Sequence, residues 1–269
     1  MDIAPYSKEE FFYLIGERLK DNDLLSPPIF VVTVNPEIAI QSIFDPKFKE
    51  ILNQSTINTA DGVGISWAIH FLHKKTVDRI TGSDSLERIC MDCAMYRQTV
   101  FFYGAAPGVA QRAAEILMER IEHLNIVGTY SPERPDMTVE ELPLDTRILL
   151  QSASVVFVAL GAPAQEKWIH ANLEKLPNCK LIIGIGGSFD FISGTRKRAP
   201  VLLRKSGLEW MFRLWLEPAR WRRMMRLPLF ALNIMMLRSS IHSITNRETR
   251  YLEEGSPSLN GTADKPPVA

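Results

Sequence analysis

The chain has 269 residues, of which 46% are hydrophobic and 23% are charged. This composition supports a sizeable buried core and excludes a disordered or fibrous protein. The formal net charge is zero, but residues 1–194 contain 17 basic and 25 acidic side chains, whereas residues 195–238 contain 11 basic and 2 acidic ones. The positive charge is therefore concentrated in one segment near the C-terminus.

The cysteine content and the apolar segments indicate in which cellular compartment the protein is expected. Three cysteines are too few for a disulfide framework, and residues 1–10 lack a basic region followed by an apolar run. Both features favour a protein of the reducing cytoplasm. The longest apolar stretch, Leu227–Leu237, contains Pro228 and is about half of the roughly 20 residues that a membrane-spanning helix needs. We expect this stretch to contact a membrane at most.

Short apolar segments alternate with longer segments of helical periodicity. The predicted strands, which are mostly apolar throughout, are Ile29–Val34, Thr56–Thr59, Thr99–Tyr103, Asn125–Thr129, Val155–Leu160 and Lys180–Ile185. The predicted helices are Pro36–Leu52, Gly62–His73, Asp84–Arg97, Pro107–Ile121, Val139–Gln151 and Gln165–Leu176. Ser83 and Thr138 are candidate caps, and Pro107 fits a first helical turn. This order predicts a doubly wound α/β domain with a mostly parallel, Rossmann-like sheet.

The composition changes after Gly194 and divides the chain into three predicted parts. Residues 1–194 form the Rossmann-like domain, and residues 195–245 form an appendage rich in Arg, Trp, Met and Leu. Residues 246–269 are polar and lack periodicity, so we expect a disordered tail.

The basic appendage has three interpretations. Basic residues with Trp at helical spacing are typical of helices that lie at an anionic membrane surface. The candidate membrane residues are Trp210, Trp215, Trp221, Arg222 and Arg226. Nucleic-acid binding is disfavoured because the rest of the chain is acidic and lacks a recognised motif. The third interpretation is a helical element packed on its own domain or on a second subunit.

Glycine and small polar residues follow five predicted strands, at the edge of the sheet where doubly wound folds bind ligands. Such turns let backbone N–H groups approach a phosphate, as do helix N-termini. Neither GxGxxG nor GxxxxGK[ST] is present, which argues against dinucleotide and Walker sites. Gly104, Gly186 and Gly187 are therefore candidate nucleotide-binding residues, with simple tight turns as the alternative.

Asp61 follows the second predicted strand. Its carboxylate could accept a proton from a substrate hydroxyl or could cap the next helix, and the local sequence favours the cap. Thr33 and Asn35 could bind substrate or close the turn before the next helix. Arg79 could contact a diphosphate or be simply solvated.

No metal site and no cofactor are expected. Cys90 and Cys93 have the CxxC spacing without a second pair to complete a zinc site. His70 and His73 share a predicted helix face without a third ligand. Residues 21–23 match a DxD motif, but they precede the first strand rather than follow one.

Six segments in order resemble the WecG/TagA/CpsF family of bacterial glycosyltransferases, over roughly residues 29–226. They read TVNPE at 33–37, ADGVGI at 60–65, RITGSD at 79–84, GAPAQE at 161–166, GIGGSFD at 184–190, and RAP at 198–200 through LEW at 208–210. The resemblance implies an inverting, metal-independent transferase for a UDP-sugar: UDP-N-acetylmannosamine, its uronic acid or a UDP-hexose. The implied acceptor is a polyprenyl-diphosphate-linked saccharide of a cell-surface polysaccharide pathway.

The resemblance also implies roles for single residues. Asp61 matches the family's proposed base, Thr33 its first turn, although Val34 replaces a frequent Pro there, and Arg79 a pocket residue. We take these three residues as candidate catalytic residues. The appendage is expected to cover the pocket and bring arginines to the diphosphate. The candidate UDP-binding residues are Asn35, Gly104, Gln165, Gly186, Gly187, Asp190, Arg213, Arg220 and Arg223.

A lipid-linked acceptor implies a peripheral enzyme on the cytoplasmic face of the bacterial inner membrane. Its expected partners are the UDP-sugar, the acceptor and the anionic lipid surface, without nucleic acid. Family members can self-associate, so a homo-oligomer is a further expectation. The alternative is a non-catalytic nucleotide-sugar-binding scaffold of the same pathway.

Overall fold

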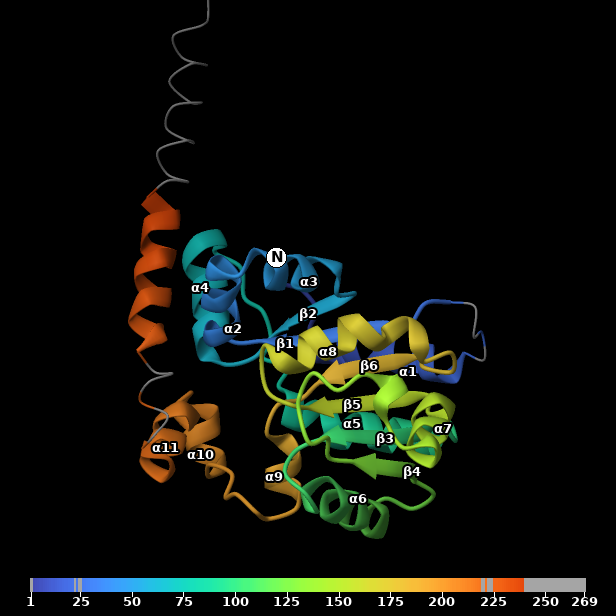
Figure 1. Cartoon of the computed structure of the whole chain (residues 1–269). Coiled ribbons are helices and arrows are strands. Elements are labelled where there is room, and N and C mark those ends of the chain that lie inside the picture. Colours follow the sequence, from blue (N-terminus) through green and yellow to red (C-terminus); the bar gives the residue numbers. More distant parts are fainter. Residues whose placement is uncertain (1, 22, 24–25, 219–220, 222–224, 240–269) are drawn as a thin grey trace, which may run out of the picture.

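The computed structural model describes residues 2–21, 23, 26–218, 221 and 225–239 (Figure 1). Its centre is a six-stranded sheet with the order β2-β1-β6-β5-β3-β4, in which every pair of neighbours is parallel. The strands are β1 (Ile29–Val34), β2 (Ile57–Ala60), β3 (Thr99–Gly104), β4 (Asn125–Tyr130), β5 (Val155–Ala159) and β6 (Leu181–Gly184). The predicted doubly wound α/β fold and its six strands are thus confirmed.

Helices cover both faces of the sheet. They are α1 (Lys8–Lys20), α2 (Pro36–Phe44), α3 (Pro46–Gln54), α4 (Val63–His73), α5 (Gly82–Met95), α6 (Val109–Arg120), α7 (Leu144–Ser152), α8 (Ala164–Asn172), α9 (Ser188–Ile192), α10 (Val201–Lys205) and α11 (Glu209–Leu216). The 3₁₀ turns η1 (Val139–Glu141) and η2 (Leu173–Lys175) precede α7 and follow α8. Residues 226–239 are also helical.

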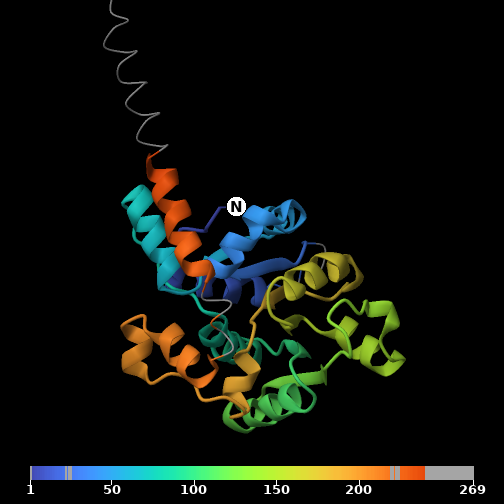
Figure 2. The same ribbon diagram turned by 60° about the vertical axis from the view of Figure 1, so that its left-hand side comes forward.

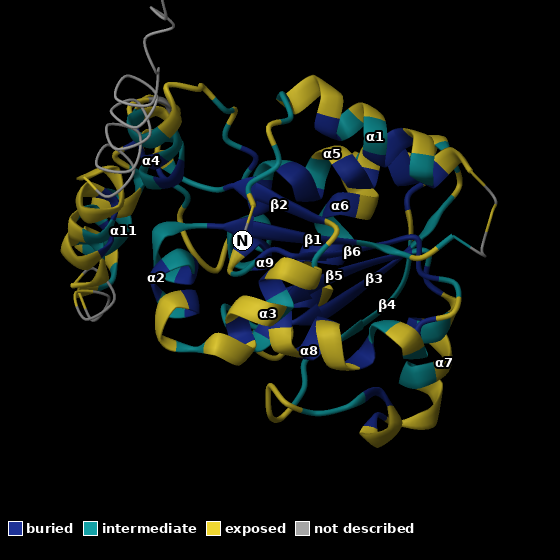
Figure 3. Cartoon of the chain, turned by 90° about the horizontal axis from the view of Figure 1, so that it is seen from above, coloured by how far each residue is buried: buried dark blue, intermediate teal, exposed yellow. Residues whose placement is uncertain are grey.

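The sheet separates two hydrophobic cores. Helices α1, α5, α6 and α9 pack on one face, and α2, α3, α4, α7 and α8 pack on the other. Neighbouring strand residues point to opposite faces, so Val31 belongs to the first core and Val32 to the second. Figure 3 shows the buried strands between helices whose outer faces are exposed. This double burial explains why the central strands β1, β5 and β6 are almost wholly apolar.

The single helix predicted over residues 36–52 is wrong. The structure has two helices, because Asp45 ends α2 and its Oδ1 accepts the N–H of Phe48 at 3.0 Å to begin α3. Pro46 occupies the first turn of α3, where its missing N–H costs nothing. The Asp-Pro pair was the available signal.

Two further helix starts differ from the prediction. Thr81, rather than Ser83, caps α5, because its Oγ1 accepts the N–H of Asp84 at 3.2 Å. Pro107 lies just outside α6, whose N-cap is Gly108 in a left-handed conformation.

The predicted helix over residues 139–151 is interrupted. Thr138 is confirmed as a cap, and its N–H donates to the Glu141 carboxylate at 2.7 Å, but it begins the turn η1 and α7 starts later. The last turn of the predicted helix 165–176 is the 3₁₀ turn η2. Helix α1 has no counterpart among the predicted elements.

The appendage lies beside the domain in two places. Helices α10 and α11 stand near the carboxyl ends of the strands, and the helical segment 226–239 runs along α4 (Figures 1 and 2). Phe230 and Ile234 are buried in the same core as α4. Arg238 donates to the Phe71 carbonyl at 3.3 Å and stacks on the Phe71 ring. The predicted tail, 246–269, lies outside the described residues.

Among the described residues, no helix has the length and apolar character that membrane crossing demands.

We predict that Gly104→Ala lowers the free energy of unfolding by about 3 kcal/mol. Gly104 ends β3 with φ +106°, and an added Cβ would lie 2.6 Å from the Ala159 carbonyl oxygen of β5. Gly108→Ala is the matched control, because its φ is +80° but nothing lies within 4 Å of the added Cβ. The control should lose only about 1 kcal/mol. Urea denaturation measures both, and equal losses would contradict the close packing of β3 on β5.

Candidate active site

A cavity of about 680 Å³ opens at the carboxyl ends of the strands. This volume is typical of a small-molecule site. From β1 the chain moves outward to β2 and then crosses to β3, on the other side of β6 and β5. The loop after β1 leads to α2 on one face of the sheet, and the loop after the neighbouring β6 leads to α9 on the other face. The two loops therefore diverge and leave a crevice, which is where doubly wound sheets bind ligands. Loops after β1, β2, β5 and β6, the first turn of α5, and α11 line this pocket.

Two polar residues at the carboxyl end of β1 line the pocket, Thr33 within the strand and Asn35 directly after it. Thr33 is buried, and its Oγ1 donates to the Gly184 carbonyl of β6 at 3.0 Å. Asn35 caps α2, because its Oδ1 accepts the N–H of Ile38 at 3.0 Å. The turn-closing interpretation therefore fits Asn35 alone, because the Thr33 hydrogen bond joins β1 to β6. Their place in the pocket keeps the substrate-binding prediction open.

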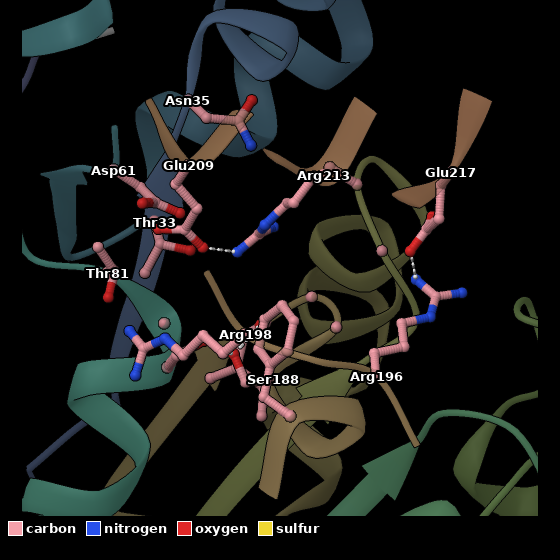
Figure 4. Close-up of a pocket in the computed structure, with 18 of the residues that line it drawn as sticks. Thr33, Asn35, Asp61, Thr81, Ser188, Arg196, Arg198, Glu209, Arg213 and Glu217 are labelled. Carbon is pink, nitrogen blue, oxygen red and sulfur yellow. Dashed lines mark hydrogen bonds and ion pairs between the residues drawn. The ribbon is translucent and has the colours of Figure 1, made fainter. Parts of the chain in front are cut away.

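Asp61 is not the cap that the local sequence favoured. Gly62 is the N-cap of α4, without a side-chain hydrogen bond. The Asp61 N–H donates to the Val34 carbonyl at 2.7 Å and so continues the pairing of β1 with β2. The half-buried side chain therefore extends from the end of the sheet into the pocket, beside Thr33 and Glu209 (Figure 4).

The environment of Asp61 shifts its acidity. Burial raises the pKa of Asp61 from 3.8 to about 7. Arg213 and Arg79 lower this pKa, and the nearby carboxylates Glu209 and Asp84 raise it. A carboxyl with a pKa near 7 exchanges protons readily at neutral pH, as a general base must.

Arg79 lies beside the pocket rather than in its wall. Its Nη2 donates to the Arg204 carbonyl at 3.0 Å, which ties α10 to the segment that pairs with Ala60 at the end of β2. The positive charge of Arg79 lowers the pKa of the Asp61 carboxyl. Arg79 therefore makes a structural hydrogen bond to α10. Its catalytic role stays a prediction.

A buried pair on α8 supports the loop after β6. The Gln165 Oε1 accepts the N–H of Gly186 at 3.0 Å, and its Nε2 donates to Glu166 Oε1 at 2.8 Å. Because Gly186 N–H can only donate, these contacts fix the orientation of the amide. A Cβ on Gly184 would lie 2.6 Å from the Gln165 Nε2, so Gln165 packs directly on β6.

Glu166 was missed by the sequence analysis, although it closes the GAPAQE segment. It is fully buried, and its Oε2 has no hydrogen-bond partner among the described residues. Burial raises the pKa of Glu166 to about 7.

Basic side chains come to the pocket from α11 and from the loop after α9. Arg213 forms an ion pair with Glu209, and its guanidinium lies 4.8 Å from the centre of the Phe191 ring. Both charged side chains belong to α11, one helical turn apart.

Two more arginines line the pocket, and sequence reasoning missed both. Arg196 lies 3.2 Å from Glu217 and 3.6 Å from Asp190. Arg198 pairs with Asp84 at 2.6 Å and so links the same loop to α5. Each pairing joins segments that are distant in the sequence, except for Asp190 with Arg196.

The pocket thus gathers seven of the predicted site residues: Thr33, Asn35, Asp61, Gln165, Gly186, Gly187 and Arg213. Gly104, Arg79 and Asp190 are not part of its lining. Asp190 lies against the wall through Arg196, and Gly104 packs on β5. Arg220 and Arg223 lie outside the described residues.

Within the described ranges, no group of three or more His, Cys, Asp or Glu side chains is arranged to hold a metal ion. The DxD segment includes residue 22, which is outside those ranges.

Four of the five predicted membrane residues are described, and all four lie at the surface. Trp215 is 76% exposed, and Trp210 and Trp221 are also exposed. Arg226 is exposed and lies 3.5 Å from the Gln41 side chain, whereas Arg222 falls outside the described residues. Large apolar side chains of the helical segment 226–239 are exposed beside them, namely Leu229, Leu232, Met235, Met236 and Leu237.

A sequence model of the glycosyl transferase WecG/TagA/CpsF family matches residues 1–243. An N-acetylglucosaminyldiphosphoundecaprenol N-acetyl-β-D-mannosaminyltransferase from Bacillus spizizenii is 34% identical over 206 residues, which are 77% of this chain and 78% of the relative. The protein of the same name from Bacillus subtilis is 33% identical over 205 residues, with 76% and 78% covered. That from Staphylococcus aureus is 29% identical over 213 residues, with 79% and 82% covered.

We predict that Asp61→Asn stabilises the protein more at pH 8 than at pH 4. Because the pKa of Asp61 is raised in the folded state, the unfolded chain ionises first as the pH rises from about 4 to about 7, and stability is lost over this range. Asparagine cannot ionise and avoids this loss. Thermal unfolding at both pH values measures the difference. Asp136→Asn, at an exposed carboxylate, is the control, and an equal gain for Asp61→Asn at both pH values would contradict the raised pKa.

Proposed function

This chain belongs to the WecG/TagA/CpsF family of glycosyltransferases, and from this premise we propose that it transfers N-acetylmannosamine from UDP to a polyprenyl-diphosphate-linked saccharide. The name shared by the relatives supports this acceptor class and this sugar. Of the three donors that the sequence leaves open, the N-acetylmannosamine donor therefore has the most support. The product would be an intermediate of a cell-surface polysaccharide.

The observation that carries the proposal is the position of Asp61 in the pocket, with a pKa near 7. The acceptor hydroxyl attacks the anomeric carbon of the donor sugar as the bond to the UDP oxygen breaks. Asp61 takes the hydroxyl proton, and UDP leaves with the electron pair of the broken bond. A single displacement of this kind inverts the anomeric configuration. Positioned bases typically contribute about 100-fold or more to such a step.

The leaving diphosphate needs positive charge as it departs. Arg213, Arg196 and Arg198 line the pocket and can supply this charge. The first turn of α5 adds backbone N–H groups at a helix N-terminus, where anions are favoured. We therefore expect transfer without a divalent metal.

Other predicted site residues hold the loops that form the pocket wall. Gln165 holds the loop after β6 through Gly186, and Thr33 holds the end of β6 through Gly184. A ligand bound on this loop would be positioned by both contacts. Arg79 would act on Asp61 through its positive charge.

The appendage is proposed to attach the enzyme to the membrane that holds the acceptor. Exposed Trp and Leu side chains can enter the interfacial region, while arginines contact anionic head groups. Because α11 lines the pocket, the same segment would keep the active site at the lipid surface. We place this surface at the cytoplasmic face, as a peripheral attachment.

We predict that Asp61→Asn lowers kcat/KM about 100-fold or more, because the hydroxyl proton loses its acceptor. UDP binding should persist, since asparagine keeps the size of the side chain. In the wild-type enzyme, kcat/KM should fall as the pH drops through about 7, where Asp61 becomes protonated. UDP release and calorimetric UDP binding measure the two effects. Full turnover by the variant would exclude Asp61 as the base, and unchanged pathway output would favour the scaffold alternative.

We predict that the double variant Trp210→Ser, Trp215→Ser binds anionic vesicles about tenfold more weakly or worse, because two exposed indoles are lost. Sedimentation with phosphatidylglycerol vesicles measures the binding. Tyr13→Ser on α1, at a side chain that is 71% exposed, is the matched control and should bind as the wild type does. Equal binding by all three proteins would contradict attachment through α11.

A further inference from the structure

Helix α11 and its C-cap present alternating charges to the pocket. Glu209 and Arg213 are four residues apart in α11, so their side chains share one helix face, and Glu217 is the C-cap that follows the helix. All three line the cavity, as Figure 4 shows. A pocket proposed to bind a diphosphate therefore contains carboxylates next to its cations.

Arg196 and Arg213 pair with these carboxylates, and they differ in the number of carboxylates that hold them. Arg196 faces both Glu217 and Asp190. Arg213 is held by Glu209 and stacks on Phe191.

Arg213 is the cation that a ligand can take over more easily, because one carboxylate holds it, whereas two hold Arg196. The side chains of Arg213 and Glu209 keep 32% and 22% of their surface exposed, so water and a ligand can reach the pair. A diphosphate offers more charge and more acceptor oxygens than a carboxylate, and it suits the planar guanidinium of arginine.

We propose that Glu209 holds Arg213 in the empty pocket, yields it to the diphosphate of the donor, and takes it back as UDP leaves. Glu209 is then a positioning residue that acts through Arg213. This inference rests on the proposed function, because the diphosphate of UDP is the competing ligand. A purely structural pair would have the opposite effect on binding, since its loss would disorder Arg213 and weaken the site.

The test is calorimetric UDP binding to the full chain, as wild type, Glu209→Gln, Arg213→Gln and the double variant. We expect Glu209→Gln to bind UDP about three- to tenfold more tightly, because Arg213 no longer has to leave a carboxylate. This gain should disappear when Arg213 is also replaced, which a double-mutant cycle measures directly. Thermal unfolding checks that each variant folds, and Glu209→Ala replaces Glu209→Gln if the latter does not.

Two further variants control for charge. Glu115→Gln removes a carboxylate from an ion pair of the exposed face of α6, with Arg112 at 3.0 Å, and should leave UDP affinity unchanged. Glu217→Gln should give a smaller gain than Glu209→Gln, because Asp190 still holds Arg196.

Unchanged or weaker UDP binding by folded Glu209→Gln would overturn the exchange, as would a gain that persists without Arg213. In either case UDP binding by the wild type would leave the proposed function standing. Absence of UDP binding by the wild type would instead contradict the proposed function and the exchange together.

Discussion

The burial of a parallel sheet on both faces is the constraint on which the site depends. Parallel strands need crossover connections, and these place every carboxyl end at the same edge. The neighbouring strands β1 and β6 lead to α2 and α9 on opposite faces of the sheet, which separates the loops at the centre of that edge. Residues from the ends of β1, β2, β5 and β6 meet there, although they are far apart in the sequence. The pocket is thus a consequence of strand order.

Charge balance is the second feature of the site. Asp61 lies where burial disfavours its ionised form, and arginines near it partly offset that cost. Each pocket arginine named above is in turn held by one or more carboxylates, so that the pocket carries its own counter-ions. A site built in this way is prepared for an anion and is also able to release it. This balance links the acidity of Asp61 to the position of α11.

Much of the fold follows from local patterns. The six strands could be predicted because most of them are largely apolar, and the order of strands and helices was sufficient for the fold class. Local signals were less reliable at helix ends. The Asp-Pro pair at 45–46 interrupts an otherwise continuous periodicity, and Thr81 rather than Ser83 caps α5. Where each of these helices begins depends on the backbone conformation of a single N-cap residue. Hydrophobic periodicity carries no information about that conformation.

Most of the predicted site residues were found because they lie at or just after the ends of predicted strands. Thr33, Asn35 and Asp61 lie at strand ends, Gln165 lies in the first turn of the helix after β5, and Arg213 of α11 came from the family resemblance. The pairing of Asp84 with Arg198 depends on contacts across 114 residues, and no local pattern encodes it. Whether Asp61 caps a helix depends on where α4 begins: the predicted start at Gly62 would make Asp61 the cap, whereas α4 begins at Val63 and Gly62 is its N-cap. The family resemblance supplied the base role that local reasoning had disfavoured.

The most direct test of the account is turnover of a panel of UDP-sugars by the full-length protein. The acceptor is a short-chain polyprenyl-diphosphate-linked N-acetylglucosamine, and UDP release and product mass are followed with and without a chelator. The account predicts that UDP-N-acetylmannosamine reacts, that the chelator has no effect, and that the product is heavier by one sugar. UDP binding without transfer from any donor, or turnover abolished by the chelator, would contradict it.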